Sequence, residues 1–142
     1  MDNYKAAQVI SGTFGEMWLN GDKMAETIAL QAKVTLKKAA IVMCGTLVDG
    51  QKVTGMELKG TLKMHKVSSY MIKALSDSIK KGKTPEFTII SKLADPDSMG
   101  SERIVLKQVT FDEVTLVDWE AKKEGEVSMP FTFMDWDPLD LI

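Results

Sequence analysis

The chain has 142 residues, a length typical of one compact domain, and we expect a single domain over residues 1–142. Apolar residues make up 44% and charged residues 27% of the sequence, the balance of a chain that folds rather than staying disordered. A formal net charge of -2 argues against a large basic surface, so tight binding of DNA or RNA is not expected.

The cysteine content and the first residues bear on where the protein is made. A single cysteine, Cys44, cannot form an intramolecular disulfide, so nothing indicates an oxidising compartment. Residues 1–27 carry too many charges for the apolar core of a signal peptide, and no segment approaches the roughly 20 apolar residues of a membrane-spanning helix. We therefore expect synthesis in the cytoplasm and no membrane anchoring.

The first half of the chain shows turn signals and alternating patterns typical of β-strands. A strand is predicted at about residues 14–19, and Asn20-Gly21 after it favours a tight hairpin turn, as does Asp49-Gly50 further on. Apolar and polar residues alternate strictly in three segments, which indicates strands with one buried face. The apolar sets are Ile28, Leu30, Ala32, Val34 and Leu36; Met56, Leu58, Leu62 and Met64; and Val127, Met129, Phe131 and Phe133.

One segment follows a helical period instead. Met71, Ile72, Leu75 and Ile79 recur at helical spacing after two serines, either of which can cap the first turn. Gly82 and then Pro85 stop the pattern, so a single helix is predicted over about residues 69–81.

The remaining segments complete an all-β pattern. Residues 87–93 and 103–111 are rich in β-branched residues and apolar on both faces in places, which favours strands that are central or lie at an interface. Residues 94–101 form a polar loop containing Pro96 and Gly100. About seven or more strands with one flanking helix predict a mainly β fold, an antiparallel sandwich or barrel.

Two stretches look like excursions from that scaffold. Residues 41–56 carry three glycines after a hydrophobic start, which fits a long hairpin that reaches beyond the domain and is irregular by itself. Residues 135–142 form a tail with apolar side chains but too few residues for a core element of their own, so we expect the tail to dock, preferably on a neighbouring subunit.

The residue types needed for catalysis or metal binding do not gather in any pattern. His65 lies on the polar face of a predicted strand, and Cys44 between apolar residues is more typical of a buried small side chain than of a nucleophile. One Cys and one His cannot supply a structural zinc site, and Asp95-x-Asp97 favours a turn over a calcium loop. We expect no catalytic residue, no metal and no cofactor.

The order of four segments carries a family resemblance. These are residues 10–26 (ISGTFGEMWLNGDKMAE), 66–75 (KVSSYMIKAL), 93–104 (LADPDSMGSERI) and 129–142 (MPFTFMDWDPLDLI). Together they resemble the tail tube proteins of contractile-tailed phages, including the defective prophage PBSX, and of R-type bacteriocins. The similarity covers essentially the whole chain.

That resemblance implies a structural subunit. It implies a β-sandwich flanked by a helix, with six copies in a ring and rings stacked into a hollow tube inside a sheath. The implied partners are further copies of the chain, the sheath, tape-measure and baseplate proteins, and DNA that passes through the lumen without specific binding. The implied location is the host cytoplasm during assembly and then the tail tube of a virion or bacteriocin particle.

In that picture the hairpin, the polar loop of residues 94–101 and the tail supply contacts between subunits and between rings. The candidate interface residues are Ile41, Val42, Met43, Leu47, Val48, Val53, Met56, Trp136, Leu139, Leu141 and Ile142. The alternative hypothesis is a monomeric β-barrel module that binds a small apolar ligand, since small barrels show the same alternating strands and flanking helix.

Overall fold

The protein, in a computed structural model that describes residues 3–142, consists of strands in two crossing layers, one helix and two short 3-10 turns. The strands are β1 Gly15–Leu19, β2 Asp22–Lys23, β3 Thr27–Ile41, β4 Gly50–His65, β5 Phe87–Leu93, β6 Glu102–Phe111, β7 Glu126–Thr132 and β8 Asp135–Asp140. The helix α1 spans Tyr70–Lys80, and the 3-10 turns span Ala6–Gln8 and Gly12–Phe14. The predicted mainly β fold with one helix is confirmed, and the runs at 87–93 and 103–111 are the central strands β5 and β6.

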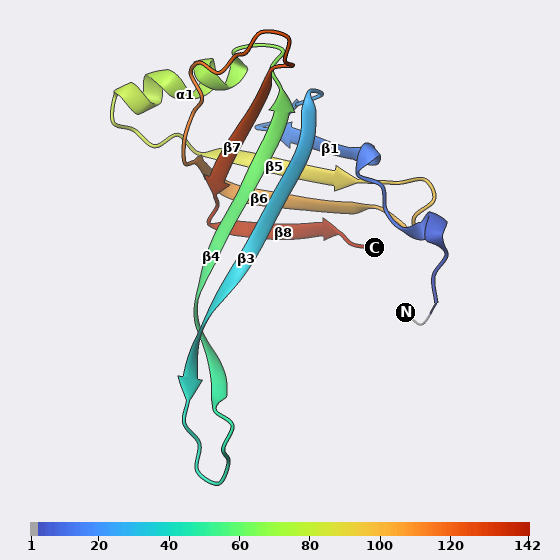
Figure 1. The fold of residues 1–142 in the computed structure, drawn as a ribbon, viewed down its shortest axis with the longest axis vertical. Coiled ribbons are helices and arrows are strands. Elements are labelled where there is room, and N and C mark those ends of the chain that lie inside the picture. The colour runs from blue at the N-terminus through green and yellow to red at the C-terminus, as the bar shows by residue number, and fades with distance from the viewer. Residues whose placement is uncertain (1–2) are drawn as a thin grey trace.

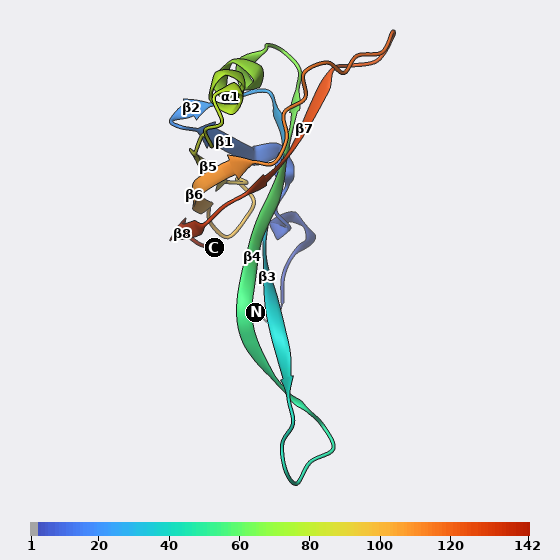
Figure 2. The same ribbon diagram turned by 90° about the vertical axis from the view of Figure 1, so that its left-hand side faces the viewer.

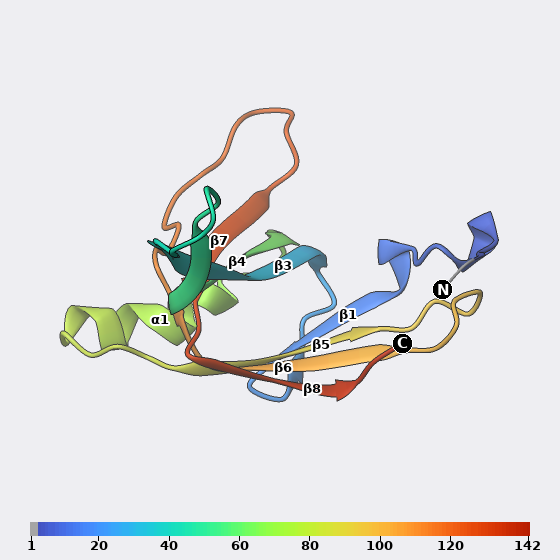
Figure 3. The same cartoon turned by 90° about the horizontal axis from the view of Figure 1, so that it is seen from below.

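All strand pairs are antiparallel, and β6 belongs to both layers. One layer contains β2, β1, β5, β6 and β8, and the other contains β3, β4, β7 and the last residues of β6. Figures 1 and 3 show the long β3–β4 pair crossing over the β1–β5–β6–β8 layer.

A bulge in β6 allows this strand to change partners. The β5–β6 register shifts by one residue between Phe87 and Ile89, and Gln108 on the opposing strand has a φ of 52°. Such a residue in the left-handed region bends the strand and increases its twist. Beyond the bulge, Thr110 and Phe111 pair with β7.

The core lies between the layers and is closed at one end by α1. Its buried side chains are Met17, Leu19, Met24, Leu62, Met64, Met71, Leu75, Phe87, Ile89, Leu106, Val109, Met129, Phe131 and Phe133. Phe111 stands edge-on between Phe87 and Phe131, with ring centroids 5.3 and 6.0 Å away. The third alternating pattern, from Val127 to Phe133, therefore does face the core.

The predicted helix is confirmed to within one residue at each end. The Ser68 hydroxyl oxygen accepts the Tyr70 N–H at 3.4 Å, whereas the Ser69 side chain makes no capping bond. Gly82 ends the helix with a φ of 72°, donating to the Ile79 carbonyl while Lys83 donates to that of Ser78. These two bonds form a Schellman motif, which needs a glycine-like conformation at this position.

The turn predictions had mixed outcomes. Asn20 and Gly21 have φ angles of 50° and 87° and join β1 to β2, as predicted. The Asp49-Gly50 turn is wrong, because Gly50 is already the first residue of β4 and pairs with Ile41. The positive φ in that connection belongs to Gly45, at 82°.

The hairpin is more regular than the sequence indicated. Pairing between β3 and β4 runs from Thr27 opposite Met64 to Ile41 opposite Gly50. Residues 50–56 are therefore strand, with one bulge opposite Lys37 and Lys38, and residues 42–49 form the connection. At about 3.3 Å per residue, arms of this length reach about 50 Å, well past the two-layer body (Figures 1 and 2).

Candidate assembly surfaces

One face of the β3–β4 hairpin is apolar along its length but is covered only near its base. Leu30 lies opposite Leu62, Val34 opposite Leu58, and Leu36 opposite Met56, so these pairs share a face. Leu62 is fully buried, whereas Met56 is 56% exposed and Leu36 47%. The prediction of a buried face on β3 is therefore wrong for Ile28, Ala32, Val34 and Leu36 in the single chain. Val34 and Leu36 are uncovered because the hairpin extends beyond the body, whereas Ile28 lies at the bulge between Thr27 and Ala29, outside the regular β3–β4 register.

The residues between the two arms form the hairpin tip, defined here as residues 42–49. Val42 is 85% exposed, and Leu47 and Val48 are exposed as well. All seven hairpin residues among the candidate interface residues are exposed: Ile41, Val42, Met43, Leu47, Val48, Val53 and Met56. The hairpin thus offers an apolar surface without a partner among the described residues of its own chain.

The C-terminal segment is not the free tail that the sequence indicated. Residues 135–140 form β8, which pairs with β6 from Lys107 opposite Asp135 to Arg103 opposite Asp140. Trp136 is half-buried against the core, while Leu139, Leu141 and Ile142 are exposed. Sequence reasoning missed this strand because its alternation is short and interrupted by Pro138, which an edge strand tolerates.

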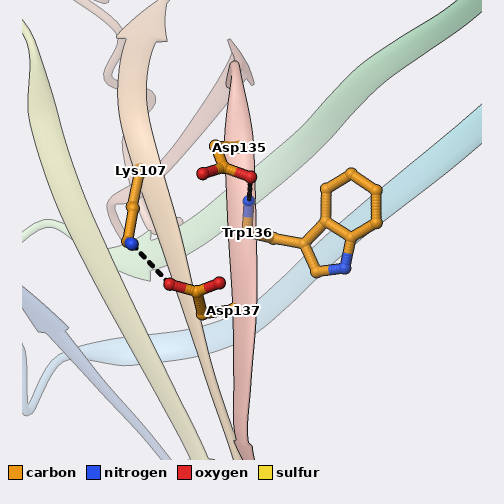
Figure 4. Close-up of polar contacts among 4 residues, drawn as sticks. All are labelled: Lys107, Asp135, Trp136 and Asp137. Atoms are coloured by element: carbon orange, nitrogen blue, oxygen red, sulfur yellow. Dashed lines mark hydrogen bonds and ion pairs between the residues drawn. The ribbon is translucent and has the colours of Figure 1, made fainter.

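An ion pair fixes β8 to β6 on the side away from the core. Figure 4 shows the Lys107 ammonium donating to the Asp137 carboxylate, with the Trp136 indole on the opposite side of β8. The hydrogen bond to Asp137, and then the charge of that carboxylate, raise the pKa of Lys107 above its ordinary value. The pair is exposed, so it orients the strand more than it stabilises it.

The two groups of candidate interface residues lie apart. The tip is at one end of the molecule, whereas the C-terminus lies beside the two-layer body (Figure 1). Ile142 there lines an apolar groove of about 290 Å³ with Tyr4, Gln8, Val9, Ile10 and Met99. This groove is where a small apolar ligand would lie under the alternative hypothesis.

A third surface was not predicted. The loop of residues 112–125, between β6 and β7, exposes Leu116, Val117 and Trp119, with the Trp119 side chain 82% exposed. The sequence feature that could have predicted this surface is a tryptophan within an acidic segment that has no strand or helix periodicity.

The chemistry-bearing residues remain separate. Cys44 lies in the hairpin tip and is exposed, so its interpretation as a buried side chain is wrong. His65 lies at the far end of β4, about 50 Å away by strand length, so the two cannot pair. Within residues 3–142, no group of three or more His, Cys, Asp or Glu side chains could hold a metal ion. No helix in the same range is long and apolar enough to cross a membrane.

Asp95 has the turn role that the sequence favoured. Its two carboxylate oxygens accept the backbone N–H groups of Ser11 and Asp97 at 2.8 and 2.9 Å. The carboxylate therefore ties the 94–101 loop to the N-terminal segment and is satisfied without a cation.

Comparison with known proteins gives consistent matches. A family model described as phage tail tube protein matches residues 2–140. The chain is 36% identical over 135 residues to the phage-like element PBSX protein XkdM of Bacillus subtilis, covering 94% of this chain and 92% of that protein.

Two solved structures share the fold at low identity. The sheath-tube complex of the extracellular contractile injection system PVC matches with a TM-score of 0.73 at 8% identity, covering 98% of this chain and 100% of that one. The tube-terminating cap of the anti-feeding prophage matches with a TM-score of 0.76 at 8% identity, covering 99% and 97%.

Proposed function

Because this chain belongs to the phage tail tube protein family, and is thus a structural subunit and not an enzyme, we propose that it closes into six-membered rings that stack into the inner tube of a contractile particle. The observation that carries the proposal is the apolar hairpin face that its own chain leaves uncovered. A surface of this kind on a soluble protein marks an interaction site.

The free edge of β3 supports closure into a ring. Among the described residues β3 pairs only with β4, and it presents an unpaired row of N–H and C=O groups along 15 residues. An edge strand of that length invites pairing with another chain, and head-to-tail pairing that closes under rotation removes it. The predicted hairpin residues and the exposed C-terminal residues Leu139, Leu141 and Ile142 then become contacts between subunits.

The surroundings of the tube follow from the same proposal. The solved structures of like fold include a sheath-tube complex, so a sheath would enclose this tube, with tape-measure and baseplate proteins as further partners. The tube would be assembled in the host cytoplasm, and its lumen would pass DNA or serve envelope penetration without specific binding. The family match leaves the small-ligand hypothesis without support.

The test is assembly of the purified chain, monitored by sedimentation and negative-stain electron microscopy. We expect rings about as high as one subunit, or tubes whose length is a multiple of that height. Leu36→Glu places a charge on the apolar hairpin face and should yield folded monomers, whereas Gln31→Glu, on the other face of β3, should still assemble. A protein that stays monomeric at every concentration, even with preformed tube ends added, would contradict the proposal.

A further inference from the structure

Two exposed apolar surfaces lie at opposite ends of the subunit. We propose that residues 112–125, here called the acidic loop, form the seat for the hairpin tip of a subunit in the adjacent ring. The inference rests on the proposed tube and assigns the partner of the tip within it.

The positions of the two segments fit a contact along the tube. The hairpin tip lies at one end of the longest axis and the acidic loop at the other in both views (Figures 1 and 2). Two different surfaces at opposite ends of one molecule make a head-to-tail contact, which repeats without closing and so builds a stack.

Both segments carry the apolar side chains that a stable contact needs. Trp119 and Val117 are 82% and 76% exposed in the acidic loop, while Val42, Leu47 and Val48 are exposed in the tip. Tryptophan is the residue type most enriched among those that dominate binding energy, and its burial by small aliphatic side chains would exclude water from the contact.

The charges of the two segments are complementary. The acidic loop contains five acidic residues and two lysines, and one of those lysines, Lys123, is paired with Glu120 at 3.0 Å. Residues 37–52, which are the tip and its flanks, contain three lysines and one aspartate, and one of those lysines, Lys37, is paired with Glu57 at 3.3 Å. Opposite potentials across an interface steer the encounter and fix its register.

The apolar groove beside the C-terminus is the competing seat, and it is less suited to the tip. The side chains that line it, Tyr4, Gln8, Val9, Ile10, Met99 and Ile142, include no charged one. The tip's flanking lysines would therefore gain no ionic partner from those side chains.

The native Cys44 in the tip permits a direct cross-linking test. In assembled tubes of Val117→Cys, mild oxidation should join Cys44 of one subunit to position 117 of the next and give a ladder of covalent oligomers on a non-reducing gel. Val117 is exposed, so the change leaves the core intact. Adding Cys44→Ser should abolish the ladder.

Met99→Cys is the matched variant for the competing groove. Tubes that cross-link through position 99 and not 117, or that cross-link through neither, overturn the inference while leaving the tube itself intact. Wild-type protein that forms no tube at all contradicts the proposed function instead.

Charge reversal gives a second, independent readout. Lys52→Glu in the tip flank or Asp118→Lys in the loop should each raise the critical concentration for tube growth about tenfold, and the double variant should recover most of that loss. If the two increases in critical concentration instead combine additively in the double variant, a contact between the two segments is contradicted.

Discussion

At the scale of single residues, the tightest packing within the β3–β4–β7 layer depends on Gly60. Gly60 pairs directly with Phe131, whose fully buried ring covers it. A Cβ at position 60 would stand 2.3 Å from the Gln31 carbonyl oxygen and 2.4 Å from the Phe131 ring. Only glycine leaves room for that ring.

Gly60→Ala should therefore lower the free energy of unfolding by at least about 1–3 kcal/mol, since the backbone of β3 and the ring must both move. Gly55→Ala in the same strand is the control, because a Cβ there meets only the flexible Lys37 side chain at 3.6 Å. Urea unfolding measures both variants, and equal stabilities would refute the packing argument.

The Lys107–Asp137 pair gives the fold a dependence on alkaline pH. The folded state raises the pKa of Lys107 above its ordinary value of 10.5. The stabilising effect of the ion pair is therefore full below pH 10.5 and is lost as pH rises through the higher pKa of the folded state. We expect wild type to unfold at slightly higher urea than Lys107→Met below about pH 10.5, and the difference to shrink as pH rises through the higher folded pKa of Lys107.

The pKa of Tyr70 is also raised, by partial burial and then by the charge of Asp22, to which its hydroxyl donates at 3.3 Å. Deprotonation of Tyr70 therefore also lowers the free energy of unfolding as pH rises, and this effect should persist in Lys107→Met. A difference between the two proteins that grows above pH 10.5 would show that the Lys107 assignment is wrong.

At the scale of elements, β8 changes the expected role of the C-terminus. A free tail could be removed without affecting the monomer, but β8 pairs with β6 at five positions from Arg103 to Lys107 and packs Trp136 on the core. Removing it would also leave a central strand with a new unpaired edge.

Deletion of residues 135–142 should thus lower the free energy of unfolding by about 1.5–3 kcal/mol or more, the value of burying one large apolar side chain. Deletion of residues 141–142 alone is the control, because both are exposed and lie beyond the strand. Thermal unfolding at one protein concentration compares them, and an unchanged transition in the longer deletion would show that β8 adds nothing to the monomer.

At the scale of the whole molecule, the fold divides into a packed body and a projecting hairpin. The tip contributes none of the buried core residues, so the fold of the single chain should not depend on it. Replacing residues 42–49 by Asn-Gly would join Ile41 to Gly50, which already pair, through a two-residue turn.

This shortened chain should unfold at the same urea concentration as wild type, yet fail to stack. We expect isolated rings instead of tubes in negative-stain images. Loss of stability would place the tip in the folding core, and normal tubes would show that stacking does not use it.

Local patterns in the sequence were sufficient for most of the elements. The helix over 69–81 follows from Met71, Leu75 and Gly82, and the Asn20-Gly21 turn from two residues that accept positive φ. Both depend on neighbours a few positions away, which is the range over which sequence patterns act. The order of segments across the chain was also sufficient to identify the family.

Burial and strand pairing, by contrast, were decided only by the tertiary structure. The alternation in β3 predicts an apolar face but does not show whether other residues cover it. Leu36 is exposed because the hairpin extends beyond the two-layer body. Residues 135–140 become a strand because β6 offers them an edge, and Gly50 is strand because Ile41 lies opposite. Such outcomes depend on residues far apart in the chain, which local sequence patterns do not relate to one another.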